Sequence, residues 1–282
     1  MLEEIIAGRA GQKEKMLASI LKELGGVVVA YSGGVDSTYL MYKARQVLGE
    51  NRVMAITASS ELYPEEEINE ARRMAGLLAV EHRVILTDEL SLPQLYANPP
   101  DRCYHCKMEL YRELANLARR ENLPAVIDGA NADDAKDYRP GLRAASESAV
   151  RSPLKEAGLT KQEIRWLARR EGLPNWDKPA AACLASRFPY GESLDRHKIR
   201  RVGDAERFLR QIGIAGDLRV RYHGQLARIE VSAAEMPVLL ELGREITEYF
   251  KKIGFAFTTL DLEGFVSGSM NRTLENEITE NF

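Results

Sequence analysis

The stretch Val27-Val-Val-Ala-Tyr31, followed directly by Ser32-Gly-Gly-Val-Asp-Ser37, decides the expected fold. The β-branched run predicts a buried strand, and a helix is expected to begin near Thr38. Between them, Gly33 and Gly34 permit a tight turn and let a ligand approach the backbone. Backbone N–H groups at the start of a helix attract anions, and the helix dipole adds to this attraction. The sequence therefore predicts a strand, a glycine turn and a helix that together bind a pyrophosphate group.

Polar side chains in the same turn extend this prediction. Ser32 and Ser37 offer hydroxyl groups to phosphate oxygens, and Asp36 offers a carboxylate to Mg²⁺. A Walker A loop is excluded because the pattern GxxxxGK[ST] is absent, and the remaining alternative is a serine-capped helix after a buried strand. The SGGVDS turn resembles that of the PP-loop ATP pyrophosphatases, which include NAD and GMP synthetases, argininosuccinate synthetase and several tRNA thiolases. This resemblance implies that the turn grips the β,γ-pyrophosphate of ATP while a substrate oxygen attacks the α-phosphorus.

Composition and charge narrow the class of protein. The 282 residues suffice for one large or two ordinary domains, and 45% of them are hydrophobic. The formal net charge of −3 gives no global electrostatic reason to expect nucleic-acid binding. No apolar run reaches the length of a membrane span, and the acidic N-terminus lacks the pattern of a secretory signal. We therefore expect a cytoplasmic protein that binds neither nucleic acid nor membranes.

Strands and helices are expected to alternate through the first two thirds of the chain. The predicted strands are 27–31, 52–57, 82–86 and 125–128, and the predicted helices are 14–24, 38–48, 64–78, 107–120 and 160–171. Thr160 and Glu163 have the spacing of a capping box at the start of the last of these helices. The alternation predicts an α/β fold with a doubly wound, mainly parallel sheet, and ligands are expected beyond the carboxyl ends of its strands.

The pattern changes after the segment 174–194, which contains three prolines and is too long for a passive connection, so a functional loop is expected there. The elements predicted after it are a basic helix at 195–212, strands at 218–223 and 226–231, a helix at 233–252 and a strand at 255–260. These elements predict a smaller C-terminal α+β domain. We place the two domains at 1–190 and 191–272, with a polar tail at 273–282.

Three cysteines are too few for a disulfide framework, and in a reducing compartment they indicate metal or redox chemistry. Cys103 and Cys106 form a CxxC pair, and Cys183 lies in the proline-containing segment. Three thiolates without a fourth suit a [4Fe–4S] cluster with one iron left open, and an open iron can bind a sulfide for donation. The alternatives are a Cys₃His zinc site that recruits His105 or another histidine, a redox dithiol with Cys183 as nucleophile, and three unligated thiols.

Further motifs indicate which of the PP-loop families this chain resembles. They are Asp128-Gly-Ala-Asn-Ala-Asp-Asp134, Asp137-Tyr-Arg-Pro-Gly141, Ser152-Pro-Leu154, Trp176-Asp-Lys-Pro179 and Cys183-Leu-Ala-Ser-Arg187. Over residues 14–272 the chain resembles the LarE-type sulfur transferases, PP-loop enzymes that build the nickel-pincer nucleotide cofactor of lactate racemase. One branch of that family consumes the cysteine of the CLASR segment as a sulfur source, and another adds a CxxC pair and carries a [4Fe–4S] cluster on three cysteines. The resemblance implies the cluster-bearing branch, with Cys103, Cys106 and Cys183 as cluster ligands.

The same resemblance implies which residues bind ATP and Mg²⁺. They are Ala30, Ser32, Gly33, Gly34, Asp36, Ser37, Thr57, Gly129, Asn131 and Asp134. Asp133 is the alternative to Asp134 as a Mg²⁺ ligand. The segment that follows residue 128 is rich in Asx residues and glycine, which suits a turn at the carboxyl edge of the sheet, near the nucleotide.

Candidate residues for the substrate and for the chemistry come from the later part of the chain. Arg219 and Arg221 stand two residues apart on a predicted strand, so both guanidinium groups share one face. The resemblance implies that they hold a substrate phosphate, and the alternative is a solvated strand face. Ser186 and Arg187 follow Cys183 closely and are expected to act in the same pocket. Together with Asp36 and Cys183 they form the expected catalytic set.

The expected function is ATP-dependent insertion of sulfur into a pyridinium dicarboxylate mononucleotide. A substrate carboxylate attacks the α-phosphorus, pyrophosphate leaves, and sulfide then displaces AMP to give a thiocarboxylate. One alternative is a tRNA thiolase, which the near-neutral charge and the absence of an appended RNA-binding module disfavour. Another is a zinc-stabilised nucleotide-binding protein without catalysis; an ammonia-using ligase is weaker still, because nothing in the sequence resembles a glutaminase domain. The resemblance also implies a homo-oligomer, and a sulfur-delivery protein is a further expected partner.

Overall fold

The computed structural model describes residues 2–136, 140–179, 182–266, 268–269 and 272. The chain divides into two compact units: Met1–Glu89 with Pro100–Ala181, and Leu90–Pro99 with Ala182–Phe282. The domain boundary expected at residue 190 stays a prediction. The predicted tail at 273–282 lies outside the described residues, and so do residues 137–139 of one of the quoted motifs.

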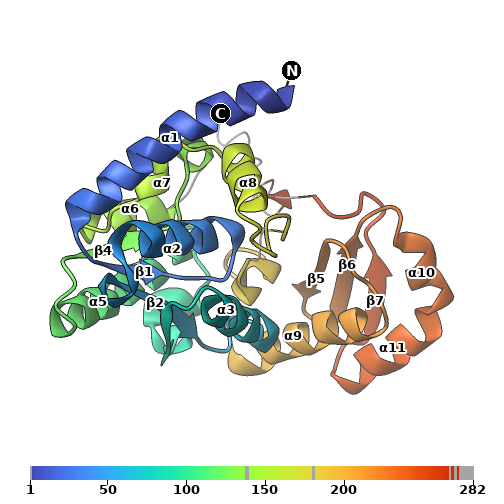
Figure 1. Cartoon of the computed structure of the whole chain (residues 1–282). Helices are drawn as coiled ribbons and strands as arrows, with labels where there is room; N and C mark the ends of the chain where they lie inside the picture. Colours follow the sequence, from blue (N-terminus) through green and yellow to red (C-terminus); the bar gives the residue numbers. More distant parts are fainter. Residues whose placement is uncertain (1, 137–139, 180–181, 267, 270–271, 273–282) are drawn as a thin grey trace, which may run out of the picture. The chain divides into compact units, whose positions relative to one another are not determined.

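The first unit contains a four-stranded parallel sheet with the strand order β3-β2-β1-β4. The strands are β1 (Val27–Ala30), β2 (Val53–Ser59), β3 (Glu81–Leu86) and β4 (Ala125–Asp128). The chain runs outward from β1 through β2 to β3 and then returns to place β4 on the other side of β1. Figure 1 shows β1 between β4 and β2. The strand order therefore reverses between β1 and β4, which is where ligands bind in open α/β sheets. Ala30 pairs with Asp128, so the turns that follow both strands leave the sheet at the same edge.

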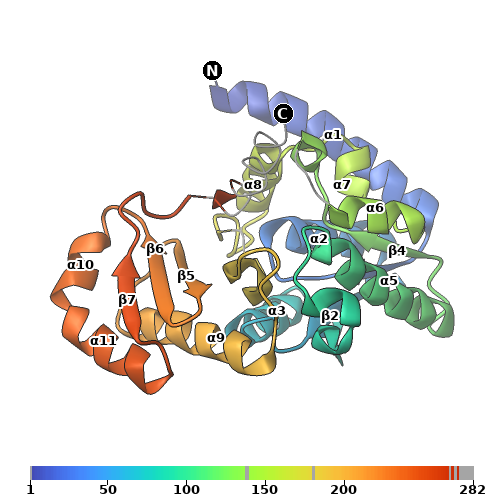
Figure 2. The same ribbon diagram turned by 180° about the vertical axis from the view of Figure 1, so that it is seen from behind.

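Helices cover both faces of this sheet. One face packs against α1 (Leu2–Leu24), α2 (Val35–Leu48), α3 (Glu65–Leu77), α7 (Pro153–Glu156) and α8 (Lys161–Arg170). The other packs against α5 (Arg102–Arg120) and α6 (Pro140–Glu147). α1 and α2 lie in front of the sheet in Figure 1, and α5 lies in front of it in Figure 2. Val27 and Val29 face the first layer and Val28 faces the second, which explains the unbroken valine run. The predicted α/β fold class is confirmed.

Three helices of the first unit begin earlier than the sequence predicted. α1 begins at Leu2 rather than at residue 14. α2 begins at Val35 rather than Thr38, so Asp36 and Ser37 lie in its first turn. α5 begins at Arg102 rather than Lys107, so the CxxC pair lies in the first turn of a helix. Tyr104 packs against the core cluster that contains Tyr111. The apolar face of α5 therefore extends to its first turn. The short helices α6 and α7 were not predicted; the 3₁₀ turns of this unit are η1 (Glu50–Arg52), η2 (Glu89–Ser91, which ends in the second unit) and η3 (Ala132–Lys136).

The second unit contains a three-stranded mixed sheet with the order β5-β6-β7. β5 (Leu218–His223) and β6 (Leu226–Val231) are antiparallel, and β7 (Phe257–Leu260) runs parallel to β6. Its other elements are α4 (Pro93–Tyr96), η4 (Leu184–Arg187), α9 (Arg196–Gln211), α10 (Met236–Glu241) and α11 (Gly243–Lys252). The helix predicted at 233–252 is thus two helices, and the second begins at Gly243, a residue with low helix propensity. None of the helices within the described residues is long and apolar enough to span a membrane.

Residues 90–99 are an early segment of the chain that belongs to the second unit. The Asn98 side chain is fully buried and donates hydrogen bonds to the carbonyl oxygens of Phe188 (3.3 Å) and Pro189 (2.8 Å). The backbone N–H groups of Gly191 and Leu194 donate to the carbonyl oxygens of Asn98 and Tyr96. The segment is therefore held by several hydrogen bonds to a stretch that follows it by some ninety residues.

Candidate active site

The predicted phosphate turn follows β1 and is closed by two serine hydroxyls. Gly33 has a φ of +73°, a conformation that favours glycine. The Gly34 N–H donates to Ser32 Oγ (3.3 Å), and Ser37 Oγ donates to the Gly34 carbonyl oxygen (3.1 Å). The two serine Oγ atoms are 3.1 Å apart. A Cβ at Gly33 would lie 3.0 Å from the Cβ of Ala71 in α3, so a larger residue would crowd this helix.

Gly129 follows β4 and touches the start of α2. A Cβ at this position would lie 2.9 Å from the backbone nitrogen of Ser37 and 3.1 Å from its Cα. Side chains other than hydrogen would therefore push apart the two segments that meet where the strand order reverses. The structure brings together Ser37 and Gly129, two of the residues that the resemblance assigns to ATP.

Asp36 is the charged residue of the turn, and its carboxylate is held by two hydrogen bonds. Its Oδ2 accepts hydrogen bonds from Lys161 Nζ (2.7 Å) and Asn131 Nδ2 (3.3 Å). Its Oδ1 is buried and has no hydrogen-bond partner among the described residues. Burial raises the pKa of the Asp36 carboxyl above its ordinary value, and the charge and hydrogen bond of Lys161 offset this only in part. A buried carboxylate oxygen without a donor suits a hard cation, so the donor set fits Mg²⁺.

The loop after β4 is fixed by hydrogen bonds from backbone N–H groups to side-chain oxygens of aspartate and asparagine. The Asn131 N–H donates to Asp134 Oδ2 (2.9 Å), and the Asp133 N–H donates to Asn131 Oδ1 (2.9 Å). The Lys161 N–H, at the start of α8, donates to Asp133 Oδ2 (2.9 Å). Both aspartates therefore shape the loop, and this loop in turn holds Asn131 against Asp36.

Thr57 and Ala30 lie at the strand ends next to the turn. The Thr57 side chain is buried, and its Oγ1 donates to the Tyr31 carbonyl oxygen (2.8 Å). The same Oγ1 is 2.8 Å from His82 Nε2. Because the only hydroxyl hydrogen of Thr57 goes to Tyr31, Nε2 of His82 must carry a proton and act as the donor. Thr57 thus ties together the three chain segments at this edge, and half-buried Ala30 ends the central strand.

Two residues of this site were not predicted from the sequence. Lys161 pairs with Asp36 across 125 positions of sequence, and Asn175 reaches Gly33 across 142. For Lys161 the sequence contains a signal. Lys161 follows the predicted capping residue Thr160, and a cation in the first turn of a helix interacts unfavourably with the helix dipole, so a lysine at this position indicates a role other than helix stability. For Asn175 we find no such signal.

The CxxC pair occupies the first turn of α5. Cys103 is exposed, and Cys106 is partly buried with its Sγ 3.9 Å from the Tyr63 hydroxyl oxygen. A spacing of three residues places both sulfur atoms on one side of the helix. His105 Nε2 lies 3.5 Å from Asp101 Oδ2, so this histidine has a carboxylate partner of its own. Among the described residues, no three His, Cys, Asp or Glu side chains are grouped so as to hold a metal ion.

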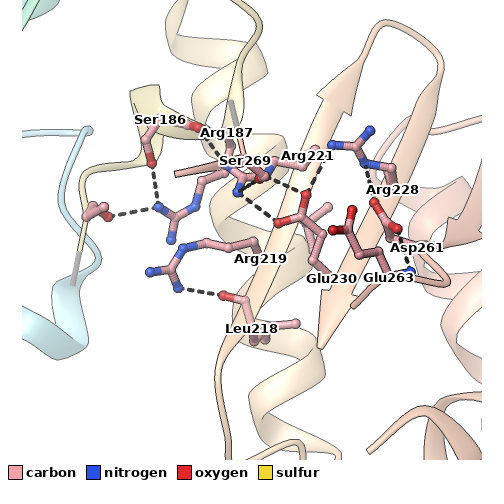
Figure 3. Close-up of polar contacts among 12 residues, drawn as sticks. Ser186, Arg187, Leu218, Arg219, Arg221, Arg228, Glu230, Asp261, Glu263 and Ser269 are labelled. Carbon is pink, nitrogen blue, oxygen red and sulfur yellow. Dashed lines mark hydrogen bonds and ion pairs between the residues drawn. The ribbon is translucent and has the colours of Figure 1, made fainter. Parts of the chain in front are cut away.

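Cys183 belongs to the second unit, whereas the CxxC pair belongs to the first. It is partly buried and precedes η4, and its carbonyl oxygen accepts from Ser186 Oγ (2.8 Å) and from Arg187 Nη1 (3.3 Å). The Arg187 guanidinium is buried and bidentate on Glu206, at 2.8 and 2.9 Å. Its Nη1 also donates to Ser186 Oγ (2.8 Å; Figure 3). Ser186 and Arg187 therefore hold Cys183 through its backbone carbonyl group.

Arg219 and Arg221, the predicted phosphate ligands, have different surroundings. Arg221 is buried, and its Nε and Nη2 contact the two oxygens of Glu230 at 2.9 and 2.8 Å. It also donates to the Ser186 carbonyl oxygen (2.8 Å) and to Ser269 Oγ (3.1 Å). Its donors are thus directed to fixed partners within the second unit.

Arg219 points away from Glu230 and lies beside Arg187 (Figure 3). Its Nη1 donates to the Leu218 carbonyl oxygen (2.7 Å), and its guanidinium carbon is 5.0 Å from the centre of the Phe265 ring. Burial and the neighbouring charges of Arg187 and Arg221 lower the pKa of Arg219 to about 10, although Glu206 acts in the opposite direction. The two predicted arginines thus differ, because a bidentate carboxylate holds Arg221 whereas like charges and burial act against the charged form of Arg219.

Comparison with known proteins gives an independent line of evidence. The family model for NAD synthase matches residues 12–101. An uncharacterised protein of Synechocystis sp. is 45% identical over 265 residues, which cover 93% of this chain and 98% of that protein. The pyridinium-3,5-bisthiocarboxylic acid mononucleotide synthase of Lactiplantibacillus plantarum is 41% identical over 262 residues, which cover 93% of this chain and 95% of the synthase. An uncharacterised protein of Methanocaldococcus jannaschii is 29% identical over 84% of this chain.

Proposed function

Because the chain belongs to the LarE-type family of PP-loop, ATP-dependent sulfur-transferring enzymes, we propose that it inserts sulfur into a carboxyl group of a pyridinium dicarboxylate mononucleotide. The observation that carries this proposal is the 41% identity to the pyridinium-3,5-bisthiocarboxylic acid mononucleotide synthase over 93% of the chain. The product is a thiocarboxylate of the kind needed for a nickel-pincer cofactor. The geometry of the phosphate turn agrees with the ATP-dependent half of this reaction.

ATP is held in this proposal by the turn after β1 and by the loop after β4. N–H groups at the start of α2 and the hydroxyls of Ser32 and Ser37 receive the β,γ-pyrophosphate group. Asp36, whose buried Oδ1 has no hydrogen-bond partner in the described part of the chain, would hold Mg²⁺ together with Asp133 or Asp134. Mg²⁺ supplies charge neutralisation for the pyrophosphate group. Lys161 adds a second positive charge beside the same carboxylate.

The chemistry has two steps. A carboxylate oxygen of the substrate attacks the α-phosphorus, the bond to the β,γ-pyrophosphate breaks, and an acyl-adenylate forms. A sulfur nucleophile then adds to the activated carbon, and AMP leaves with the electron pair of the broken C–O bond. The residues of the turn stabilise the negative charge that builds on the departing pyrophosphate, and they hold the α-phosphorus in line with the attacking oxygen.

Cys103, Cys106 and Cys183 are the proposed sulfur-handling residues. Two thiols one helical turn apart fit neighbouring ligands of one centre, and three thiolates match the number needed for a [4Fe–4S] cluster with an open iron. Such a cluster supplies a binding place for the sulfide that is transferred. The contacts of Ser186 and Arg187 support a role in fixing the Cys183 backbone.

Arg219 is the proposed ligand of the substrate phosphate. Its lowered pKa reflects burial next to two other arginines, and an anion at this position would relieve their mutual repulsion. Arg221 supports the same place indirectly, because it binds Glu230 and the Ser186 carbonyl oxygen. Assembly as a homo-oligomer, a sulfur-delivery protein and a cytoplasmic location belong to the same proposal and stay predictions.

The test is anaerobic purification followed by iron, zinc and sulfide analysis of wild type and of Cys103→Ala, Cys106→Ala and Cys183→Ala. Each variant is expected to lose bound iron and sulfur transfer but to keep pyrophosphate release with the pyridinium dicarboxylate mononucleotide. His105→Ala is the control and is expected to keep its iron, because His105 faces Asp101. Zinc in place of iron would rule out the cluster, and pyrophosphate release that depends on tRNA would favour the thiolase alternative.

A further inference from the structure

Asn175 contacts the phosphate turn from a distant part of the sequence. It lies in the loop after α8 and is only 5% exposed. Its Nδ2 donates to the Gly33 carbonyl oxygen (3.2 Å) and to Thr38 Oγ1 (2.9 Å). A carbonyl oxygen only accepts hydrogen bonds, so the atom that faces Gly33 must be the amide nitrogen. The orientation of the Asn175 amide is thus fixed by its partners.

The contact to Gly33 controls the orientation of a whole peptide group. The Gly33 carbonyl and the Gly34 N–H belong to one planar peptide and point in opposite directions. Two successive glycines allow this peptide to rotate at low cost. In the observed orientation the Gly34 N–H faces Ser32 Oγ (3.3 Å). A rotated peptide would place the Gly33 carbonyl oxygen, an acceptor that repels an anion, on the side that carries the serine hydroxyl. A donor behind the carbonyl therefore selects the orientation that binds an anion.

The loop that carries Asn175 is anchored firmly enough to perform this task. The Lys178 N–H donates to the Asn175 carbonyl oxygen (3.1 Å). Lys178 Nζ forms an ion pair with Glu67 of α3 (2.7 Å), and Arg165 of α8 donates to the Lys178 carbonyl oxygen (3.1 Å). The ring of the neighbouring Trp176 has its centre 5.1 Å from the guanidinium carbon of Arg169. These contacts come from two helices of the same unit and hold the amide in place.

The other end of the Asn175 amide has no compensating contact. Its Oδ1 is buried without a hydrogen-bond partner among the described residues. A buried acceptor without a donor costs free energy, and an apolar side chain of similar size would avoid that cost. An apolar side chain would not donate to the Gly33 carbonyl. The donor function therefore accounts for the amide at this position, whereas packing does not.

We infer that Asn175 is a positioning residue for phosphate binding, which keeps the Gly34 N–H on the side of the turn that carries the Ser32 hydroxyl, where the pyrophosphate group is proposed to bind. The inference rests on the proposed function in one respect only, namely that this turn binds the pyrophosphate group of ATP. Asn175 itself is not in contact with the anion. Its role is to remove the alternative peptide orientation before ATP arrives.

The experiment compares Asn175→Asp with Asn69→Asp in the full-length protein. Asn69 is exposed on α3, so its variant introduces the same charge without touching the turn. Equilibrium binding of inorganic pyrophosphate and of AMP is measured by calorimetry. Asn175→Asp is expected to weaken pyrophosphate binding about 10-fold or more, because the new carboxylate faces the Gly33 carbonyl oxygen. AMP binding is expected to change by less than about twofold, and Asn69→Asp to match wild type for both ligands.

The outcomes separate this inference from the proposed function. Wild-type affinity of Asn175→Asp for pyrophosphate, or an equal loss for pyrophosphate and AMP, overturns the inference alone. Failure of the wild-type protein to bind either ligand overturns the proposed function as well. If Asn175→Asp does not fold, the inference is tested instead by nuclear magnetic resonance of the wild-type protein. The side-chain amide signals of Asn175 are expected to shift when pyrophosphate is added, and unshifted signals at saturation overturn the inference.

Discussion

The phosphate turn of the first unit and the arginine cluster of the second prepare for anions in different ways. In the turn the donors are backbone N–H groups and hydroxyls, and the one buried carboxylate keeps an oxygen without a partner among the described residues. In the cluster, Arg187 and Arg221 are each held by a carboxylate, Glu206 and Glu230. The turn thus offers mainly neutral donors, and its carboxylate is paired with Lys161 from 125 positions away. In the cluster each of these two arginines is occupied by a carboxylate, 19 and 9 positions away. Replacements in the turn should mainly lower activity, and replacements in the cluster should mainly lower stability.

The largest loss of activity is expected for Asp36→Asn in the turn. Loss of the carboxylate should lower pyrophosphate release on the order of 10³-fold, because the proposed Mg²⁺ ligand is removed. The folded-state pKa of Asp36 is raised by burial, so its ionised form disfavours folding at neutral pH. The variant should therefore be at least as stable as wild type at pH 7, and this difference should vanish as the pH falls below the ordinary pKa of an aspartate. Thermal unfolding from acidic to neutral pH checks the sign, and a variant that is less stable at pH 7 would contradict it.

In the arginine cluster, replacement of a paired residue should lower the stability of the protein, in contrast to Asp36→Asn. Arg221→Lys replaces a bidentate contact with Glu230 by a point charge and should lower the free energy of unfolding by about 2–4 kcal/mol. Arg219→Gln is the matched comparison. The pKa of Arg219 is lowered to about 10, so its charged form disfavours folding at pH 7 and its removal should not reduce stability. Denaturant unfolding tests both variants, and the KM for the nucleotide substrate should rise in Arg219→Gln. Equal stability losses in the two variants would break the contrast between them.

A smaller effect is expected where the two segments of the turn meet. Gly129→Ala places a methyl group 2.9 Å from the Ser37 nitrogen and should lower the free energy of unfolding by about 1–3 kcal/mol, with weaker ATP binding. Gly76→Ala in α3 is the control, because its added Cβ meets nothing within 4 Å. It should raise stability by about 0.5–1 kcal/mol. The comparison is made by urea unfolding, and a stable Gly129→Ala that binds ATP normally would show that the two segments are able to separate without cost.

The turn could be predicted from the sequence because its determinants are adjacent. Gly33, Ser37 and Asp36 all lie within six positions of the chain, and local backbone preferences suffice to place them. The valine run likewise predicted a strand buried on both faces. The pairing of Asp36 with Lys161 was not predictable, because it depends on the order in which the strands and helices are assembled.

The partners of the arginine cluster (Arg187, Arg219 and Arg221) could not be predicted from the sequence. The alternation of Arg219 and Arg221 correctly indicated a strand, but a shared strand face does not determine which charged partner each side chain meets. Glu206 lies on α9, and Glu230 lies opposite Arg219 on the neighbouring strand but contacts Arg221, so the pairing of the strands alone does not assign either partner. The sequence also placed the CxxC pair before a helix, because the prolines that precede it obscured how early the helix begins.

The segment 90–99 has a practical consequence for anyone who wishes to study the smaller unit alone. A fragment that starts at residue 182 would lack Asn98, and it would leave the carbonyl groups of Phe188 and Pro189 without their donor. A protein truncated after residue 181 would conversely keep Asn98 but lose the carbonyl groups to which its buried side chain donates. Only a circular permutant or a fusion that supplies both pieces would give an autonomous version of that half.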